Sequence, residues 1–304
     1  DYGHPSSPSG HRAMGTDEFT SNHSRPQTES EHSMLNPMDY ESLLAQVVQL
    51  VEDAGLLLIT EWQRPEGPRG SGDKAEVDIE IESLLRPGLL QLLDCDFWGE
   101  ETGHRLTGAR YCWVVDPNDG TADFLKGHKG SAISVGLLED SQPVLGVVYA
   151  PVLEGEQPDC IAWAKGSPTL LRNGKPVAVT LPRKEWSQSS KVMVSTAATG
   201  KPELNSELCS PGSFVAMPSI AYRLARVAAG DGDAGVSLVP VSAHDVAAGH
   251  ALLIGAGGVL IDQDGNGITY VTEANMQTVS RRCFGGTREA CQSLASRNWS
   301  KVFT

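Results

Sequence analysis

Residues 114–124 read VVDPNDGTADF and follow directly on a β-prone run. Such a run brings Asp116 to a strand end, where the proline after it removes an N–H and favours a turn. Asp119 can then point the same way as Asp116, and a helix can start at Gly120-Thr121 with free N–H groups that bind phosphate. Carboxylate and carbonyl oxygens beside a phosphate are what Mg²⁺ requires. For this segment alone, an Asx-turn with solvated acids is an equally good interpretation.

The composition narrows the class of protein. The 304 residues include 24 Lys and Arg against 38 Asp and Glu, so the net charge is 24 − 38 = −14. This acidic balance argues against a nucleic-acid polymer as partner, because such partners select basic surfaces. No uninterrupted apolar run reaches the roughly 18 residues of a membrane helix, and no signal core is visible. A small anionic substrate stays possible, since bound metal ions can reverse the local charge.

The chain divides into an N-terminal extension and two expected halves. Residues 1–35 are rich in Ser, His, Pro and Gly without periodicity, which indicates a disordered extension or an added leader. Asn36-Pro37 predicts a helix start, and apolar residues follow at helical spacing to Leu58. A second helix is predicted over Ala75–Leu93, with a break or kink at Pro87-Gly88. We expect an N-terminal α+β half over 36–182 and a C-terminal α/β half over 183–304.

Strand and helix signals alternate through the rest of the chain. The predicted strands cover 111–115, 131–138, 144–149, 191–195 and 258–261, and the predicted helices cover 219–229 and 246–256. Asn173-Gly174 is a turn signal. This alternation predicts a layered α/β architecture.

Six cysteines are spread singly through the sequence, and none forms a CxxC pair. A zinc ribbon is therefore not expected. Unpaired buried thiols are typical of a reducing compartment, so the sequence predicts a cytoplasmic protein.

Two further acidic segments accompany residues 116–121: Glu100-Glu101 in WGEETG, and Asp245 in HDVAAG. Together the three segments resemble the three signatures of the inositol monophosphatase superfamily, which are Mg²⁺-dependent, lithium-sensitive phosphatases. Their order and spacing match from about residue 39 to the C-terminus. The resemblance implies an αβαβα sandwich with a metal site between its halves. It also implies a small phosphorylated metabolite as substrate and a possible homodimer.

The resemblance also implies roles for single residues. Glu100, Asp116 and the carbonyl of Asn118 would hold one Mg²⁺. Asp116, Asp119 and Asp245 would hold a second, and Glu101 would act on an outer third ion or its waters. Asp78 and Thr121 would orient the attacking water, and the phosphate would meet Asp119 and the N–H groups of Gly120 and Thr121.

Electrostatics agrees with this assignment independently. Four crowded carboxylates, those of Glu100, Asp116, Asp119 and Asp245, would repel one another and take up protons unless cations neutralised them. Two cations would also polarise a phosphate and activate a water.

Some positions depart from the family pattern. His244 replaces a customary Trp and is expected either to pack in its place or to contact substrate as a leaving-group acid. Asn118 replaces an apolar residue, and Ala75 replaces a threonine near Asp78. Residues 234–244 hold no acid, Arg or Lys, so the usual readers of ring hydroxyls or of a nucleotide are absent. Ser195, Ser219 and Ser237 are candidates to line the substrate pocket.

Three functions compete. The first is a Mg²⁺-dependent phosphomonoesterase acting on a small polyol, inositol or sugar phosphate. The second is a 3′(2′),5′-bisphosphate nucleotidase with the same chemistry, which an aromatic or apolar slot for a base would favour. The third is a phosphate-binding protein without activity, which would have lost a metal ligand. No ligand is lost in this sequence.

Overall fold

The computed structural model describes residues 37–155, 157–178 and 180–304, of which Asp39–Thr304 form one compact unit. The extension predicted over 1–35 lies outside the described residues. The proposed halves, 36–182 and 183–304, stay a prediction.

The first two helices pair with each other. Helix α1 covers Tyr40–Trp62 and begins later than predicted, because Asp39 caps it and accepts from the Ser42 N–H at 3.0 Å. Helix α2 covers Glu76–Leu92 and continues through Pro87, so the predicted break is wrong. Gly88 lies against α1, where an added Cβ would stand 2.8 Å from Leu50 Cδ2. Close packing of the two helices thus outweighs the local cost of the proline.

Helix α1, with 23 residues, is long and apolar enough to cross a membrane, judged by length and composition alone. Its apolar face nevertheless packs inside the unit. Val47, Val51 and Leu58 are fully buried, and α1 contacts α2 and β7. This is the pattern of an amphipathic helix that packs on the protein with one face.

The first sheet has eight strands in the described chain, in the order β10-β9-β8-β7-β6-β5-β3-β4. Their bounds are β3 Asp96–Gly99, β4 His104–Arg105, β5 Tyr111–Asp119, β6 Ala132–Glu139, β7 Gln142–Ala150, β8 Asp159–Ala164, β9 Leu170–Arg172 and β10 Lys175–Val177. The predicted hairpin of β6 and β7 is confirmed, and its turn residues Asp140 and Ser141 both have positive φ. The turn at Asn173-Gly174 is confirmed likewise, with positive φ at both residues.

The second sheet has five strands in the order β12-β11-β13-β15-β14. Their bounds are β11 Lys191–Val194, β12 Ser213–Ala216, β13 Ala234–Ser237, β14 Val259–Asp262 and β15 Cys283–Gly286. The helices around it are α4 Pro202–Cys209, α5 Ile220–Ala228, α6 Ala243–Gly255 and α8 Arg288–Ala295. Shorter elements are β1 Gly70–Ser71, β2 Lys74–Ala75, α3 Thr121–Leu125, α7 Glu273–Gln277, η1 Leu181–Arg183, η2 Thr196–Gly200 and η3 Trp299–Phe303.

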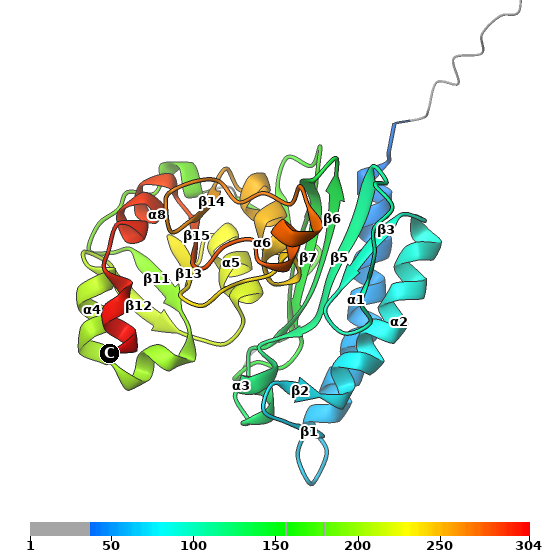
Figure 1. Ribbon diagram of the computed structural model, residues 1–304, viewed down its shortest axis with the longest axis horizontal. Coiled ribbons are helices and arrows are strands. Elements are labelled where there is room, and N and C mark those ends of the chain that lie inside the picture. Colours follow the sequence, from blue (N-terminus) through cyan, green and yellow to red (C-terminus); the bar gives the residue numbers. More distant parts are fainter. Residues whose placement is uncertain (1–36, 156, 179) are drawn as a thin grey trace, which may run out of the picture. The chain divides into compact units, whose positions relative to one another are not determined.

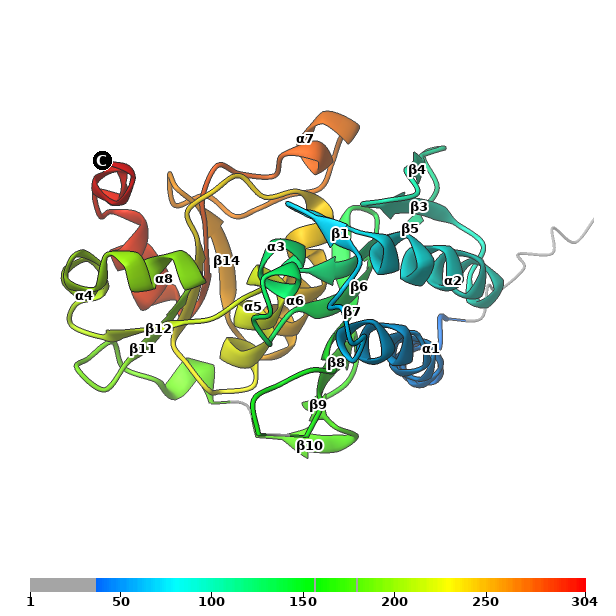
Figure 2. The same ribbon diagram turned by 90° about the horizontal axis from the view of Figure 1, so that it is seen from below.

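Five layers result within Asp39–Thr304. Helices α1 and α2 cover one face of the first sheet, and α5 and α6 fill the space between the two sheets (Figure 1). Helices α4 and α8 pack on the far side of the second sheet (Figure 2). The predicted αβαβα sandwich is confirmed. All six cysteines are buried and free of disulfides in this part of the chain.

Candidate active site

The pairing of two strands brings the first two acids together. Strand β3 pairs in parallel with β5, and its last residue, Gly99, is opposite Val115. Glu100 and Asp116 come next on these strands, and the Glu100 N–H donates to the Val115 carbonyl at 3.2 Å. Two acids that are 16 positions apart in sequence therefore become neighbours at one sheet edge.

A bulge in β5 explains how Asp116 and Asp119 share a side. The sequence predicted that the strand stops at Asp116, but β5 continues to Asp119. Asp116 is opposite Ser134 and Asp119 is opposite Ala132, so three steps along β5 match two along β6. Residues three apart would otherwise face opposite ways, and the extra residue corrects the alternation.

Helix α6 supplies the fourth acid from the other side. Asp245 is its third residue, and its Oδ2 accepts from the Ser242 N–H at 2.6 Å. The hydrogen bond holds this carboxylate at the helix N-terminus, where the helix dipole favours negative charge.

Donor atoms from these elements converge in two groups. One group consists of Glu100, Asp116 and His244, and the other consists of Asp116, Asp119 and Asp245. Within each group, all donor atoms lie within 4.8 Å of one another. Asp116 belongs to both. The four predicted ligand carboxylates are thus in one cluster and not on separate surfaces.

The protein alone compensates this negative charge only in part. Burial first, and then the charges of Asp245 and Asp119, raise the pKa of Glu100 to about 8. Burial, with repulsion from Glu100 and Asp119, raises the pKa of Asp116 well above its ordinary value. Burial also raises the pKa values of Asp119 and Asp245 to about 6. Carboxylates that resist ionisation together fit a site for divalent cations, which would neutralise them.

A hydrogen-bonded triad lies beside the cluster. Asp78, in the first turn of α2, is fully buried, and its Oδ2 accepts a hydrogen bond from the Thr121 hydroxyl at 2.7 Å. The Asn118 amide donates to the other oxygen, Oδ1, at 3.0 Å. Burial raises the pKa of Asp78 to about 6, while these two donors act to lower it. The predicted pairing of Asp78 with Thr121 is therefore present, and the part played by the Asn118 side chain is new.

Comparison with known proteins decides the family. The model of the inositol monophosphatase family matches residues 39–296. The "Probable inositol 1-monophosphatase" of Mycobacterium tuberculosis is 30% identical over 250 residues, which is 75% of this chain and 87% of that protein. This chain belongs to the inositol monophosphatase family.

Other relatives widen the range of substrates within the family. A 3′(2′),5′-bisphosphate nucleotidase of Salmonella typhimurium is 28% identical over 249 residues, covering 75% of this chain and 94% of its own. A solved inositol monophosphatase (IMPase) of Thermotoga maritima has a TM-score of 0.67 at 22% identity, covering 86% of this chain and 98% of its own. As a family member the protein is a phosphoric monoester hydrolase, and the comparisons leave its specific substrate open.

A buried acid that the sequence analysis missed supports the Glu101 loop of this inositol monophosphatase family member. Glu82 is fully buried and accepts from the Glu101 N–H at 3.1 Å, and it also accepts from the Thr102 N–H. Burial, and then the charge of Glu82, raises the pKa of Glu101. An acid on the apolar face of a predicted helix was the signal available in the sequence.

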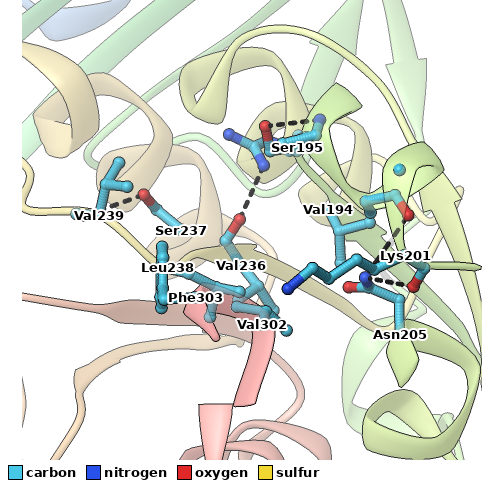
Figure 3. A pocket seen from close by; sticks show the side chains of 14 residues that line it. Val194, Ser195, Lys201, Asn205, Val236, Ser237, Leu238, Val239, Val302 and Phe303 are labelled. Carbon is cyan, nitrogen blue, oxygen red and sulfur yellow. Dashed lines mark hydrogen bonds between the residues drawn. The ribbon is translucent and has the colours of Figure 1, made fainter. Parts of the chain in front are cut away.

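Ser195 lies outside the acidic cluster, in a neighbouring pocket of about 380 Å³ (Figure 3). The residue after it, Thr196, donates to Asp123 at 3.0 Å, which connects the pocket to α3, the helix that follows β5. Ser237 also lines this pocket. The contact with substrate predicted for Ser195 and Ser237 stays a prediction. Ser219 instead donates to Asp119 Oδ2 at 2.6 Å.

Arg223 was not among the predicted site residues. It is 6% exposed, donates to the carbonyls of Ser219 at 3.2 Å and Val236 at 2.9 Å, and lines the same pocket. The sequence has no Lys or Arg between residues 233 and 245, whereas α5 supplies Arg223 from ten residues before that segment.

His244 lies beside the cluster and not in the pocket. Its Nε2 is 3.6 Å from Asp245 Oδ1 and 3.8 Å from Glu100 Oε1. Burial lowers the pKa of His244 to about 4, so the ring is neutral near pH 7. The contact with substrate predicted for this residue stays a prediction.

Proposed function

We propose that this protein is a Mg²⁺-dependent phosphomonoesterase that cleaves a small phosphorylated metabolite with an activated water. The convergence of Glu100, Asp116, Asp119 and Asp245 around shared donor positions is the observation that carries the proposal. These side chains and the Asn118 carbonyl would hold the cations. When bound, Mg²⁺ neutralises the carboxylates and withdraws charge from the phosphoryl group.

The Asp78–Thr121 pair is suited to handle the proton of the attacking water. The Thr121 hydroxyl donates to Asp78 and can accept a hydrogen bond from a water in turn. A carboxylate with a pKa of about 6 is ionised at pH 7 and can take up the proton through this hydroxyl. Glu101, held by Glu82 at the rim of the cluster, is the proposed contact to an outer cation or its waters.

The start of α3 is the proposed phosphate contact. Gly120 has φ of +96°, and an added Cβ would stand 3.2 Å from the Ser219 nitrogen. A side chain is therefore disfavoured at Gly120, and the backbone N–H groups of Gly120 and Thr121 are the proposed donors to the phosphate.

Phosphate release from the full chain with Mg²⁺ tests this function. Asp78→Asn and Thr121→Val should each lower kcat by about 100-fold or more, as expected for loss of a group that orients or deprotonates the nucleophile. Thr121→Ser keeps the hydroxyl and should recover most of the activity. Turnover that persists in excess chelator would contradict the proposal.

A nucleotide is the second candidate substrate, and the pocket of Ser195 favours it. Its described lining contains no acid to read ring hydroxyls, but it includes Leu238, Val239 and Phe303 together with the cations Lys201 and Arg223. Figure 3 shows the Lys201 side chain extending toward Val236. Apolar walls with two cations suit a base and an additional phosphate better than a polyol ring.

A substrate panel distinguishes the two candidates. It compares inositol 1-phosphate, a sugar phosphate and adenosine 3′,5′-bisphosphate. If the substrate is a nucleotide, Leu238→Glu should raise KM for the bisphosphate by about 10-fold or more, since an acid in the pocket lining would repel it. If the substrate is a polyol phosphate, inositol phosphate should have the highest kcat/KM, and the substitution should not weaken it.

We further propose, on the family resemblance, two or three Mg²⁺ ions per site, inhibition by Li⁺, a homodimer and a cytoplasmic location. Inhibition by millimolar Li⁺, light scattering of the pure protein and fractionation of its host cells check these points separately.

A further inference from the structure

One side chain beside the acidic cluster is neither an acid nor a packed apolar group. His244 is the second residue of α6, and its side chain is 15% exposed. Its Nδ1 is buried and has no hydrogen-bond partner among the described residues. Its Nε2 faces Glu100 and Asp245 at 3.8 and 3.6 Å, beyond hydrogen-bond range.

The 3.8 Å between His244 Nε2 and Glu100 Oε1 lies within the range spanned by donor atoms around one cation. Bonds of about 2.0–2.2 Å place two ligands of an ion about 3 Å apart when adjacent and about 4.2 Å apart when opposite. His244, Glu100 and Asp116 offer donor atoms within 4.8 Å of one another. A nitrogen and two carboxylates are thus positioned to share an ion with little movement.

The two donor groups differ in chemistry. The group of Asp116, Asp119 and Asp245 offers oxygen only, which suits Mg²⁺. The group of Glu100, Asp116 and His244 offers one imidazole nitrogen, a donor that suits Co²⁺, Zn²⁺ and similar ions better than Mg²⁺.

We propose that His244 Nε2 is a ligand of the cation held by Glu100 and Asp116, and that this donor raises the affinity of this one position for a late first-row divalent metal more than its affinity for Mg²⁺. The inference rests on the proposed function in that cations occupy this cluster. It replaces the contact with substrate and the packing role that the sequence suggested for His244.

Metal binding by the full chain tests this, with Co²⁺ and Mg²⁺ as separate calorimetric probes. His244→Phe should weaken Co²⁺ at one site by at least about 10-fold and Mg²⁺ by less than about 3-fold. The NMR spectrum of the Co²⁺-loaded His244→Phe variant should also lack one hyperfine-shifted, exchangeable imidazole N–H resonance that the Co²⁺-loaded wild type shows. The matched control is His104→Phe, because the His104 ring stacks on Trp98 at 4.3 Å and phenyl keeps this contact. His4, His11, His23 and His32 are present in every variant, so their metal binding cancels.

Unchanged Co²⁺ affinity and an unchanged set of shifted N–H signals in His244→Phe would overturn the inference while leaving the phosphatase proposal intact. Equal losses of Co²⁺ and Mg²⁺ would overturn the metal preference. If wild-type protein bound neither metal at the cluster, the proposed function would fail together with the inference. Where His244→Phe does not fold, as judged by its thermal transition, His244→Gln replaces it with the same expected losses.

Discussion

The side chain of Asn118 has a role that the surrounding sequence does not predict. The resemblance assigned this position a carbonyl ligand only. In the structure its amide donates to Asp78, and its Oδ1 is buried without a partner in the described chain. The amide thus orients the carboxylate that is proposed to take up the proton.

Asn118→Ala should lower kcat by about 10-fold, the cost of losing one hydrogen bond to a charged group. The same bond lowers the pKa of Asp78, so its removal raises that pKa above about 6. The acidic limb of the kcat profile should then shift to higher pH, with a larger loss near pH 6 than near pH 8. If the acidic limb of the kcat profile lay at the same pH in Asn118→Ala as in the wild type, the amide would not act on Asp78.

At the scale of elements, α6 approaches the first sheet through glycine. A Cβ added to Gly146 of β7 would lie 2.4 Å from the Ala248 carbonyl oxygen. Since α6 also carries Asp245, its height above the sheet sets where one proposed ligand lies.

Gly146→Ala should therefore reduce stability by about 1–3 kcal/mol through overpacking. It should also weaken Mg²⁺ binding, because α6 must move. Gly267→Ala is the control, since an added Cβ there meets nothing within 4 Å. Urea unfolding and calorimetry measure both effects, and equal behaviour of the two variants would rule out the close contact.

Helix α1 offers a second test at this scale, because its two faces differ. Val51 is fully buried, whereas Leu56 is 60% exposed. Val51→Asp should abolish folding by burying an unpaired charge, and Leu56→Asp should change stability by no more than about 0.5 kcal/mol. Soluble yield and thermal unfolding give the comparison. Similar damage from both substitutions would instead indicate that α1 is surrounded by apolar material, as in a membrane.

At the scale of the whole molecule, the crowded acids link stability to pH and metal. Glu100 has a pKa raised to about 8, and the pKa of Asp116 is raised well above its ordinary value. The metal-free folded state therefore binds more protons than the unfolded state up to about pH 8, and its stability falls as pH rises. Below about pH 6.5 the lowered pKa values of His244 and His250 act in the opposite direction.

The thermal midpoint of chelator-treated protein should consequently be lower at about pH 7.5 than at about pH 6.5. Saturating Mg²⁺ should raise the midpoint, and more so at the higher pH, because the cation replaces the protons. Glu100→Gln should flatten the pH dependence of the metal-free protein. If the thermal midpoint of the metal-free protein rose between about pH 6.5 and 7.5, the carboxylates of this cluster would not repel one another as inferred.

Much of the architecture could be predicted from the sequence because its signals are local. The hairpin of β6 and β7, the start of α3 after Gly120 and the turn at Asn173-Gly174 follow from turn residues and alternation over a few positions. Three acidic segments in a family-like order also predicted which carboxylates would meet. These features depend on the residue types at a few neighbouring positions in the chain.

The remainder depended on contacts between segments far apart in the chain. The bulge that aligns Asp116 with Asp119 arises from pairing with β6, and α2 continues through Pro87 because it packs on α1. Arg223 reaches the pocket, and His244 turns toward Glu100, only once α5 and α6 lie between the sheets. Such placements minimise the free energy of the whole packed unit. This free energy depends on contacts between segments that are far apart in the chain, so no local stretch of sequence determines it.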